Sequence, residues 1–199
     1  EHCTTGHAWR PHLLASDLAG GEFSLCWNDI TLSARQAKVL YGARAHVDDS
    51  SVTLQIDLCV ADMLDVTLCY RLRTDTAVIE QWLVVTPLQA GTLRRVAPLT
   101  LRVDSLTTPV LHWARGLQGH GAGMPETGPY PAFQIRHEPL GEVLLESGLR
   151  STWQEIAWLA LDNNTGGDGL FVGLLYSGRW SATAHAVADN GANIDLYTD

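Results

Sequence analysis

Apolar and polar residues alternate along several segments of this 199-residue chain. In residues 50–58 (SSVTLQIDL) and 65–73 (DVTLCYRLR), the even-numbered positions from Val52 onward are apolar, and most of the odd ones are polar. Successive side chains of a β-strand point to opposite faces, so this pattern predicts half-buried antiparallel strands. Residues 77–85 (AVIEQWLVV) are more evenly apolar, which is typical of a strand covered on both sides.

Strand-like segments recur along the rest of the chain, separated by residues that favour turns, such as the Asp48-Asp49-Ser50 group. The best helical candidate, residues 31–43, has no convincing cap, so we expect one helical turn at most. The pattern predicts a largely antiparallel all-β sandwich or barrel that forms a single domain over residues 1–199. The other predicted strands are 22–27, 29–35, 92–104, 108–114, 130–137, 154–161, 170–177, 181–188 and 192–197.

The charge of the chain excludes some classes of partner. It carries 22 acidic against 13 basic residues, a formal net charge of -9, without a basic cluster. Nucleic-acid binding needs concentrated positive charge, so we expect no such partner. No apolar run approaches the roughly 18 residues of a membrane span, and no signal peptide opens the chain. We therefore predict a cytoplasmic protein that does not enter a membrane.

The cysteines and the acidic loop give no sign of a metal or cofactor. The four cysteines include no Cys-x-x-Cys pair, which predicts structural free thiols; they are Cys3, Cys26, Cys59 and Cys69. The loop that begins at Asp162 has glycine at the fifth and twelfth positions, where a calcium loop has oxygen ligands. A hairpin connection explains its Asn and Gly residues better. We expect no cofactor.

Two arrangements could carry sugar chemistry. Glu138, Glu142 and Glu146 are evenly spaced, but a solvated charged edge explains them better than a pair of catalytic carboxyls. A sugar mutarotase would pair a His acid with a Glu base, and either His137 or His185 could serve with Glu142. The sequence does not show whether these residues meet.

Tryptophan can stack on pyranose rings or fill a core, and the chain has seven. Trp82 lies within an apolar strand, which favours the core. Trp113, Trp153 and Trp180 lie at strand ends beside loops, where a ligand-facing role is more frequent. One of these loops, residues 114–131, is long and rich in glycine and proline, as functional loops often are.

The order of several segments is similar to that of a known enzyme family. They are LDVTLCYRLRTDTAVIEQWLVVTPL, HWARG, the glycine-rich loop, LLESGLRSTWQEIAWLALDNN and GDGLFVGLLYSGRW. In this order, over roughly residues 50 to 190, they resemble the amino-terminal domain of glycoside hydrolase family 36, which comprises mainly α-galactosidases. Arg179 stands where the family usually has Asn after Ser-Gly.

The resemblance implies a β-supersandwich of the galactose mutarotase type, placed before a (β/α)8 catalytic barrel in a longer parent chain. It also implies that both catalytic aspartates belong to that barrel, so we assign no catalytic residue to this chain. The implied partners are the barrel, a galactoside ligand and further copies in a homo-oligomer. The candidate carbohydrate-facing residues are Trp113, His120, Tyr130, Trp153, Arg179 and Trp180.

Three alternatives remain open from the residues alone. An independent carbohydrate-binding module would share the sandwich fold and the tryptophans. A mutarotase-like enzyme would use the His and Glu pairing described above. A purely structural sandwich would bind no sugar.

Overall fold

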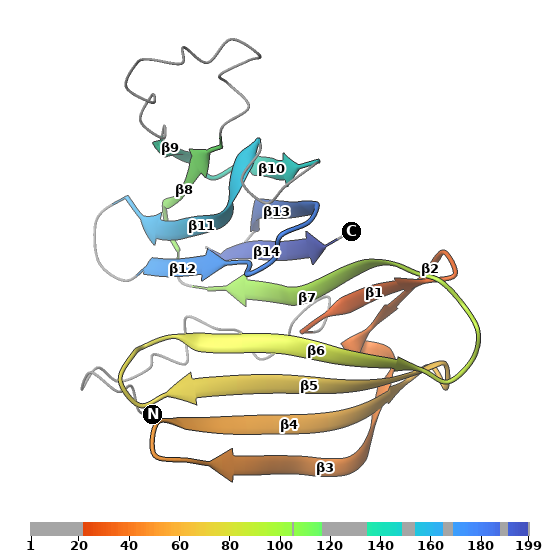
Figure 1. Cartoon of the computed structure of the whole chain (residues 1–199). Helices are drawn as coiled ribbons and strands as arrows, with labels where there is room; N and C mark the ends of the chain where they lie inside the picture. Colours follow the sequence, from red (N-terminus) through yellow and green to blue (C-terminus); the bar gives the residue numbers. More distant parts are fainter. Residues whose placement is uncertain are drawn as a thin grey trace, which may run out of the picture. The chain divides into compact units, whose positions relative to one another are not determined.

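The computed structural model describes residues 22–104, 106–116, 135–148, 154–164, 169–187 and 191–198. These residues form β-strands in antiparallel sheets, together with one short 3-10 helix (Figure 1), so the all-β prediction is confirmed. The chain divides into two compact units, Glu1–Leu101 and Arg102–Asp199, which are described separately. The single domain over residues 1–199 stays a prediction. In the described ranges, no helix has the length and apolar character needed to cross a membrane.

The first unit contains a four-stranded antiparallel sheet in which the order of strands follows the chain. Its strands are β3 (Ala37–Val47), β4 (Ser51–Val60), β5 (Leu64–Arg73) and β6 (Ile79–Pro87). Strands β4 and β5 pair without a slip, so Leu58 lies opposite Val66 and Ile56 opposite Leu68. The even-numbered apolar residues of both strands therefore share one face, as the alternation predicts.

Three more strands complete the first unit: β1 (Ser24–Trp27), β2 (Ile30–Ser33) and the first part of β7 (Leu93–Val103). Strand β1 pairs with both β2 and β7. One buried cluster joins side chains from β1 and β2 to the apolar face of β4 and β5. Its members are Phe23, Leu25, Trp27, Leu32, Leu58, Val60, Leu64, Val66 and Leu68. The first unit is thus a sandwich around an apolar core.

Residues 31–43, the best helical candidate, are mostly strand. The 3-10 helix η2 (Ala34–Gln36) supplies the expected helical turn, and Ser33 donates its backbone N–H to Oε1 of Gln36 at 2.6 Å. Strand β3 follows at once and was not predicted. Its pairing with β4 shifts register between Val39 and Ala43, and Gly42 adopts φ +80° there. Apolar residues occupy every odd position from Ala37 to Val47, so the alternation that predicts a strand continues through this irregularity, and the helical interpretation of residues 31–43 concealed it.

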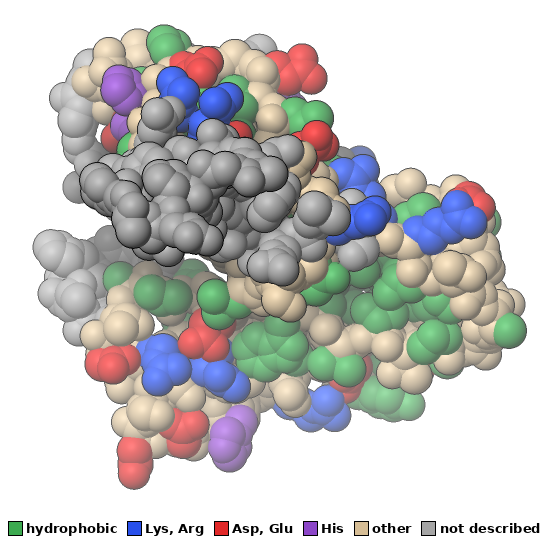
Figure 2. Space-filling model, turned by 45° about the horizontal axis from the view of Figure 1, so that its top comes forward, with side chains coloured by type: hydrophobic (Ala, Val, Ile, Leu, Met, Phe, Trp, Pro, Cys, Tyr) green, Lys and Arg blue, Asp and Glu red, His purple; other side chains and the backbone are tan. Residues whose placement is uncertain are grey.

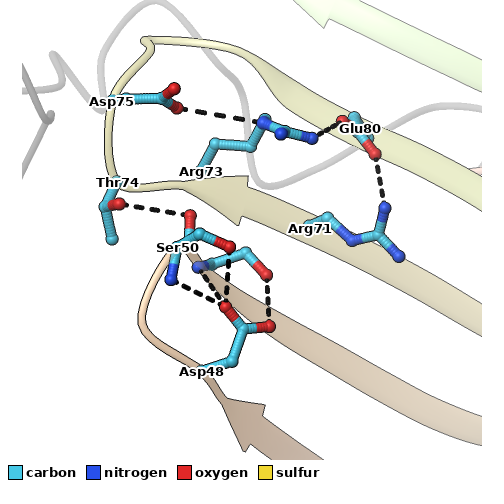
Figure 3. A network of polar contacts seen from close by, with 8 residues as sticks. Asp48, Ser50, Arg71, Arg73, Thr74, Asp75 and Glu80 are labelled. Carbon is cyan, nitrogen blue, oxygen red and sulfur yellow. Dashed lines mark hydrogen bonds and ion pairs between the residues drawn. The ribbon is translucent and has the colours of Figure 1, made fainter.

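Asp48 organises the turn between β3 and β4 (Figure 3). Its Oδ1 accepts the backbone N–H groups of Ser50 at 2.8 Å and Ser51 at 2.7 Å, and its Oδ2 accepts the Ser51 hydroxyl at 2.9 Å. These hydrogen bonds, that from the Ser50 backbone first, hold the pKa of Asp48 well below its ordinary value. Asp48 therefore acts as a turn residue, as its sequence context predicts.

An ion-pair network lies at the neighbouring β5–β6 turn (Figure 3). Glu80 of β6 contacts Arg71 at 3.1 Å and Arg73 at 3.4 Å, and Arg73 also lies 3.8 Å from Asp75. The Arg71 guanidinium lies 5.0 Å from the centre of the Trp82 ring. Trp82, predicted as core, thus lies on the face that carries these charged groups, and it is half-buried rather than fully enclosed.

The second unit contains two sets of antiparallel strands. One is a four-stranded sheet in the order β12 (Gly169–Gly173), β11 (Glu155–Asn163), β8 (Pro109–Arg115), β9 (Ile135–Pro139). The other places β13 (Trp180–Val187) between β10 (Glu142–Ser147) and β14 (Gly191–Thr198). Both sets contribute fully buried side chains, among them Leu111, Leu159, Leu161, Trp180, Ala182, Ile194 and Leu196.

The cysteines that the structure describes are free thiols, as predicted. Cys59 and Cys69 are buried and Cys26 is partly buried. Cys3 and residues 130–134, the start of one predicted strand, lie outside the described residues.

Replacing Gly91 with alanine should destabilise the first unit. A Cβ atom at this position would overlap the buried indole of Trp27 and come within 2.8 Å of the Asn28 side chain. Overpacking of this kind costs about 1 to 3 kcal/mol. Gly141→Ala is the matched control, because nothing lies within 4 Å of its added Cβ. Urea denaturation of both variants measures the difference, and equal stabilities would contradict the packing around Trp27.

Replacing Asp48 with alanine should lower the free energy of unfolding at neutral pH. Because the pKa of Asp48 is depressed by folding, its contribution is present above the ordinary value of 3.8 and is lost as the pH falls through the folded value. The difference between wild type and Asp48→Ala should therefore shrink in acid. Asp49→Ala serves as the control. Denaturant titrations over a pH series test this, and a difference that does not change with pH would refute the role of the carboxylate.

Candidate functional site

The ends of several strands meet at one end of the second unit, which we call the loop end. Here β8 ends and β9 begins, β10 ends and β11 begins, and β12 ends and β13 begins. Cross-strand pairs fix this arrangement: Glu155 lies opposite Arg115, and Ser147 lies opposite Trp180. The loops that follow β8, β10 and β12 therefore leave the sheets on the same side, where loops of a β-sandwich commonly carry function.

Hydrogen bonds between strand ends hold the loop end together. Gly116 donates its backbone N–H to the carbonyl of Gln154 at 2.8 Å. The backbone N–H of Gln154 lies 3.3 Å from the hydroxyl of Ser147, which accepts it, and Gln154 Oε1 accepts the N–H of Gly148. Ser147 is only 1% exposed. These hydrogen bonds thus join the ends of β8 and β10 to the start of β11.

Glu155 is the most perturbed titratable group of the loop end. Burial raises its pKa, while the positive charges of Arg115 and Arg136 act in the opposite direction. Its Oε1 lies 3.8 Å from Nε of Arg115, a long ion pair, and its side chain is only 17% exposed. The other oxygen, Oε2, is buried and has no hydrogen-bond partner within the part of the chain that the structure describes.

Sequence reasoning did not select Glu155. A buried carboxyl with a shifted pKa and only one oxygen in an ion pair is characteristic of functional sites, although structural ion pairs can shift a pKa as well. The sequence pointed to Glu155 only through its position, because this residue follows shortly after Trp153. Its burial and its two arginine neighbours come from β8 and β9, which are distant in the chain.

The structure describes three of the six predicted carbohydrate-facing residues. Trp113 is 7% exposed and Trp180 is 2% exposed, so both indoles are packed inside the second unit. Arg179 is exposed. His120, Tyr130 and Trp153 lie outside the described residues, but the loops that contain them leave from the loop end. The carbohydrate-facing role of all six stays a prediction, and the burial of the two indoles shows that they also serve packing.

The Ser177-Gly178-Arg179-Trp180 segment leads the chain from the exposed turn back into the core. A Cβ atom at Gly178 would lie 2.7 Å from ring atoms of Tyr176, so glycine allows the tyrosine ring to fold over the backbone. Leu175 is fully exposed, and Tyr176 is 40% exposed. Residues 175–179 thus present a leucine, a tyrosine and an arginine to the solvent just before β13 begins.

The structure places His185 beside Glu142, one of the two His and Glu pairings that the mutarotase alternative requires. The two residues are directly opposite each other on β13 and β10. Nε2 of His185 lies 3.2 Å from Nδ2 of Asn193, which orients the ring. Glu142 and Glu146 are both exposed, in agreement with a solvated edge. His137 belongs to a different sheet, where it pairs with His112 of β8.

No group of three or more His, Cys, Asp or Glu side chains with metal-binding geometry occurs among the described residues. Basic and acidic side chains are interspersed on the face that Figure 2 shows.

Comparison with solved structures shows what this fold is similar to. The α-galactosidase AgaA of Geobacillus stearothermophilus, a member of glycoside hydrolase family 36, matches over 88% of this chain with a TM-score of 0.63 and 18% identity. The α-galactosidase of Lactobacillus brevis matches over 88% with a TM-score of 0.59 and 13% identity. The galactosidase domain of the α-galactosidase-sucrose kinase AgaSK gives 0.60 and 16%.

These matches confirm the resemblance at the level of the fold. The matched region is 26% of the length of AgaA and of the AgaSK galactosidase domain, and 25% of the Lactobacillus brevis enzyme, so the chain spans about a quarter of those proteins. Neither protein-family models nor curated protein sequences give a match.

Replacing Glu155 with glutamine should change how stability depends on pH. Because folding raises the pKa of Glu155, stability linked to its protonated form is present below the ordinary value of 4.5 and is lost as the pH rises through the folded value. A neutral glutamine avoids that loss. Relative to wild type, Glu155→Gln should therefore be more stable at neutral pH than at about pH 4.

Urea titrations at both pH values measure this effect. Glu146→Gln, a change on an exposed position of β10, is the control and should behave as wild type. A Glu155→Gln variant that follows the wild-type pH profile would show that the burial of this carboxyl has no energetic consequence.

Proposed function

We propose that this chain is a non-catalytic, amino-terminal β-sandwich domain of an α-galactosidase-like glycoside hydrolase. The extent of the fold match supports this most directly, because the match covers 88% of this chain but only 26% of the α-galactosidase AgaA. In this proposal, the parent enzyme hydrolyses terminal α-galactosides in a separate (β/α)8 barrel. The chain itself contributes binding and packing surfaces.

An exposed apolar row on the first unit supports a packing role. Val47, Val52, Leu72 and Ile79 lie side by side across β3, β4, β5 and β6, and they are 69%, 37%, 39% and 40% exposed. Val52 and Leu72 lie on the same face of the sheet as the core residues of β4 and β5. Apolar side chains gathered in this way mark interaction surfaces. The proposal assigns the row to contact with the remainder of the parent chain or with a further copy in a homo-oligomer.

The loop end of the second unit is the proposed substrate side of the domain. Arg179 is exposed there, and the loops with His120, Tyr130 and Trp153 start there. Arginine and aromatic side chains are suited to hydroxyl groups and to the apolar faces of sugar rings, respectively. The loops would shape the entrance to a galactoside pocket in the barrel rather than form the pocket alone.

A mutarotase-like enzyme is the second candidate, because Glu142 and His185 lie opposite each other. A sugar epimerisation of this type needs an acid and a base on the two sides of the ring oxygen and the anomeric hydroxyl. The pair lies at the end of β13 away from the loop end, since Trp180 begins that strand.

The decisive test is the coding sequence downstream of residue 199. A (β/α)8 barrel in the same reading frame is expected, and a stop codon directly after Asp199 would refute the proposal. The isolated chain should not hydrolyse a chromogenic α-galactoside, whereas the parent should. It should also leave the optical rotation of fresh galactose unchanged relative to buffer. Mutarotation that is lost in a His185→Ala variant would establish the second candidate instead.

A further inference from the structure

A second group of side chains, on the face of a sheet rather than in the loops, combines stacked aromatic rings with polar groups. It lies on one face of the sheet β12-β11-β8-β9 and consists of His112, His137, Trp158, Asp162 and Phe171. We call it the platform. The opposite face of the same sheet carries the buried residues Leu111, Leu159 and Leu161. Because side chains alternate between faces, the residues of the platform all point the other way.

The register of the sheet places the platform residues in order. His137, His112, Ala160 and Phe171 form one row across β9, β8, β11 and β12. The row covers three strand spacings, about 14 Å. Trp158 and Asp162 lie on either side of Ala160 along β11. Ala160 separates the aromatic side of the row from the histidine side.

The aromatic side consists of Trp158 and Phe171. Their rings are stacked, with centroids 5.4 Å apart and an angle of 28° between planes. Phe171 is nevertheless 67% exposed, although it belongs to a regular strand. The tryptophan holds the phenylalanine ring in a fixed orientation, so a flat apolar surface faces the solvent. Such rigid rings bind the apolar faces of ligands at a low cost in conformational entropy.

The polar side consists of the two histidines and Asp162. Nε2 of His112 lies 3.2 Å from Oδ2 of Asp162, and the rings of His112 and His137 are 6.0 Å apart. The nitrogen is close to the carboxylate but makes no aligned hydrogen bond. This contact therefore does not saturate the Asp162 carboxylate. The Asp162 side chain is 46% exposed and can accept hydrogen bonds from a ligand.

We propose that the platform binds a neutral oligosaccharide. A pyranose ring has an apolar face, which suits Phe171, and rim hydroxyls, which suit Asp162 and the exposed His137 as hydrogen-bond partners. With His neutral, the platform carries one negative charge, which disfavours phosphorylated or acidic sugars. The length of the row fits a chain of sugar rings rather than a single one. This surface includes none of the residues that the proposed function assigns to the substrate side, so the inference goes beyond the proposed function.

The experiment titrates the full 199-residue chain with raffinose and stachyose, followed by saturation-transfer NMR and calorimetry. Wild type should bind at least one of them saturably. Phe171→Ala should weaken binding about tenfold, the loss typical of an anchor residue at an interface. Phe171→Tyr, which keeps a flat ring, should retain it. Asp162→Asn, which keeps one acceptor oxygen, should weaken binding less than Phe171→Ala.

Tyr41→Ala is the matched control, because Tyr41 is an 81% exposed aromatic residue on β3 of the other unit. Circular dichroism checks that each variant folds. Absence of saturable binding by wild type, or equal binding by wild type and Phe171→Ala, would overturn the inference. So would size-exclusion profiles in which Phe171→Ala dissociates an oligomer, since the platform would then be a protein contact. These outcomes do not depend on whether a barrel is encoded downstream.

Discussion

The uninterrupted pairing of β4 with β5 is the constraint on which the first unit depends. All ten residues of each strand pair, from Ser51 opposite Arg73 to Val60 opposite Leu64. A slip of one residue would turn every apolar side chain of one strand to the solvent face. Because the register holds, Leu58, Val66 and their neighbours meet β1 and β2 in one buried cluster.

The same face of that sheet continues beyond the core as the exposed apolar row. The register that buries Leu58 and Val66 also aligns Val52 with Leu72 at the other end of the strands, where no described residue covers them. A sandwich that closes over only part of its sheet is suited to work as one part of a larger assembly. The coverage of about a quarter of the matched α-galactosidases agrees with this view, although at 13 to 18% identity the likeness concerns the fold alone.

The roles that we propose for the second unit fall on two kinds of position, strand ends and a strand face. Its loop end gathers a poorly paired carboxyl, Glu155, with two arginines, while the platform lies on the regular part of a sheet. Residues on regular strands hold their positions more precisely than residues on loops. The Trp158–Phe171 stack and the His112–Asp162 contact both lie on regular strands.

The sequence by itself determined the all-β class, most strand positions and the turn at Asp48, because these depend on local alternation and turn chemistry. It missed β3, whose residues were taken up in the helical candidate 31–43 and are almost all exposed, and it did not select β10, whose glutamates suggested only a charged edge. It identified the strand ends that bear Trp113, Arg179 and Trp180. It did not identify Glu155 or the platform.

Those features required the tertiary structure, because their partners are far apart in the chain. Arg115 and Arg136 reach Glu155 only when β8, β9 and β11 lie side by side. His112, Asp162 and Phe171 share a face only through the register of four strands. Burial of Trp113 and Trp180 was likewise decided by packing, since a tryptophan at a strand end can turn either to the core or to the solvent, and its own segment does not fix which.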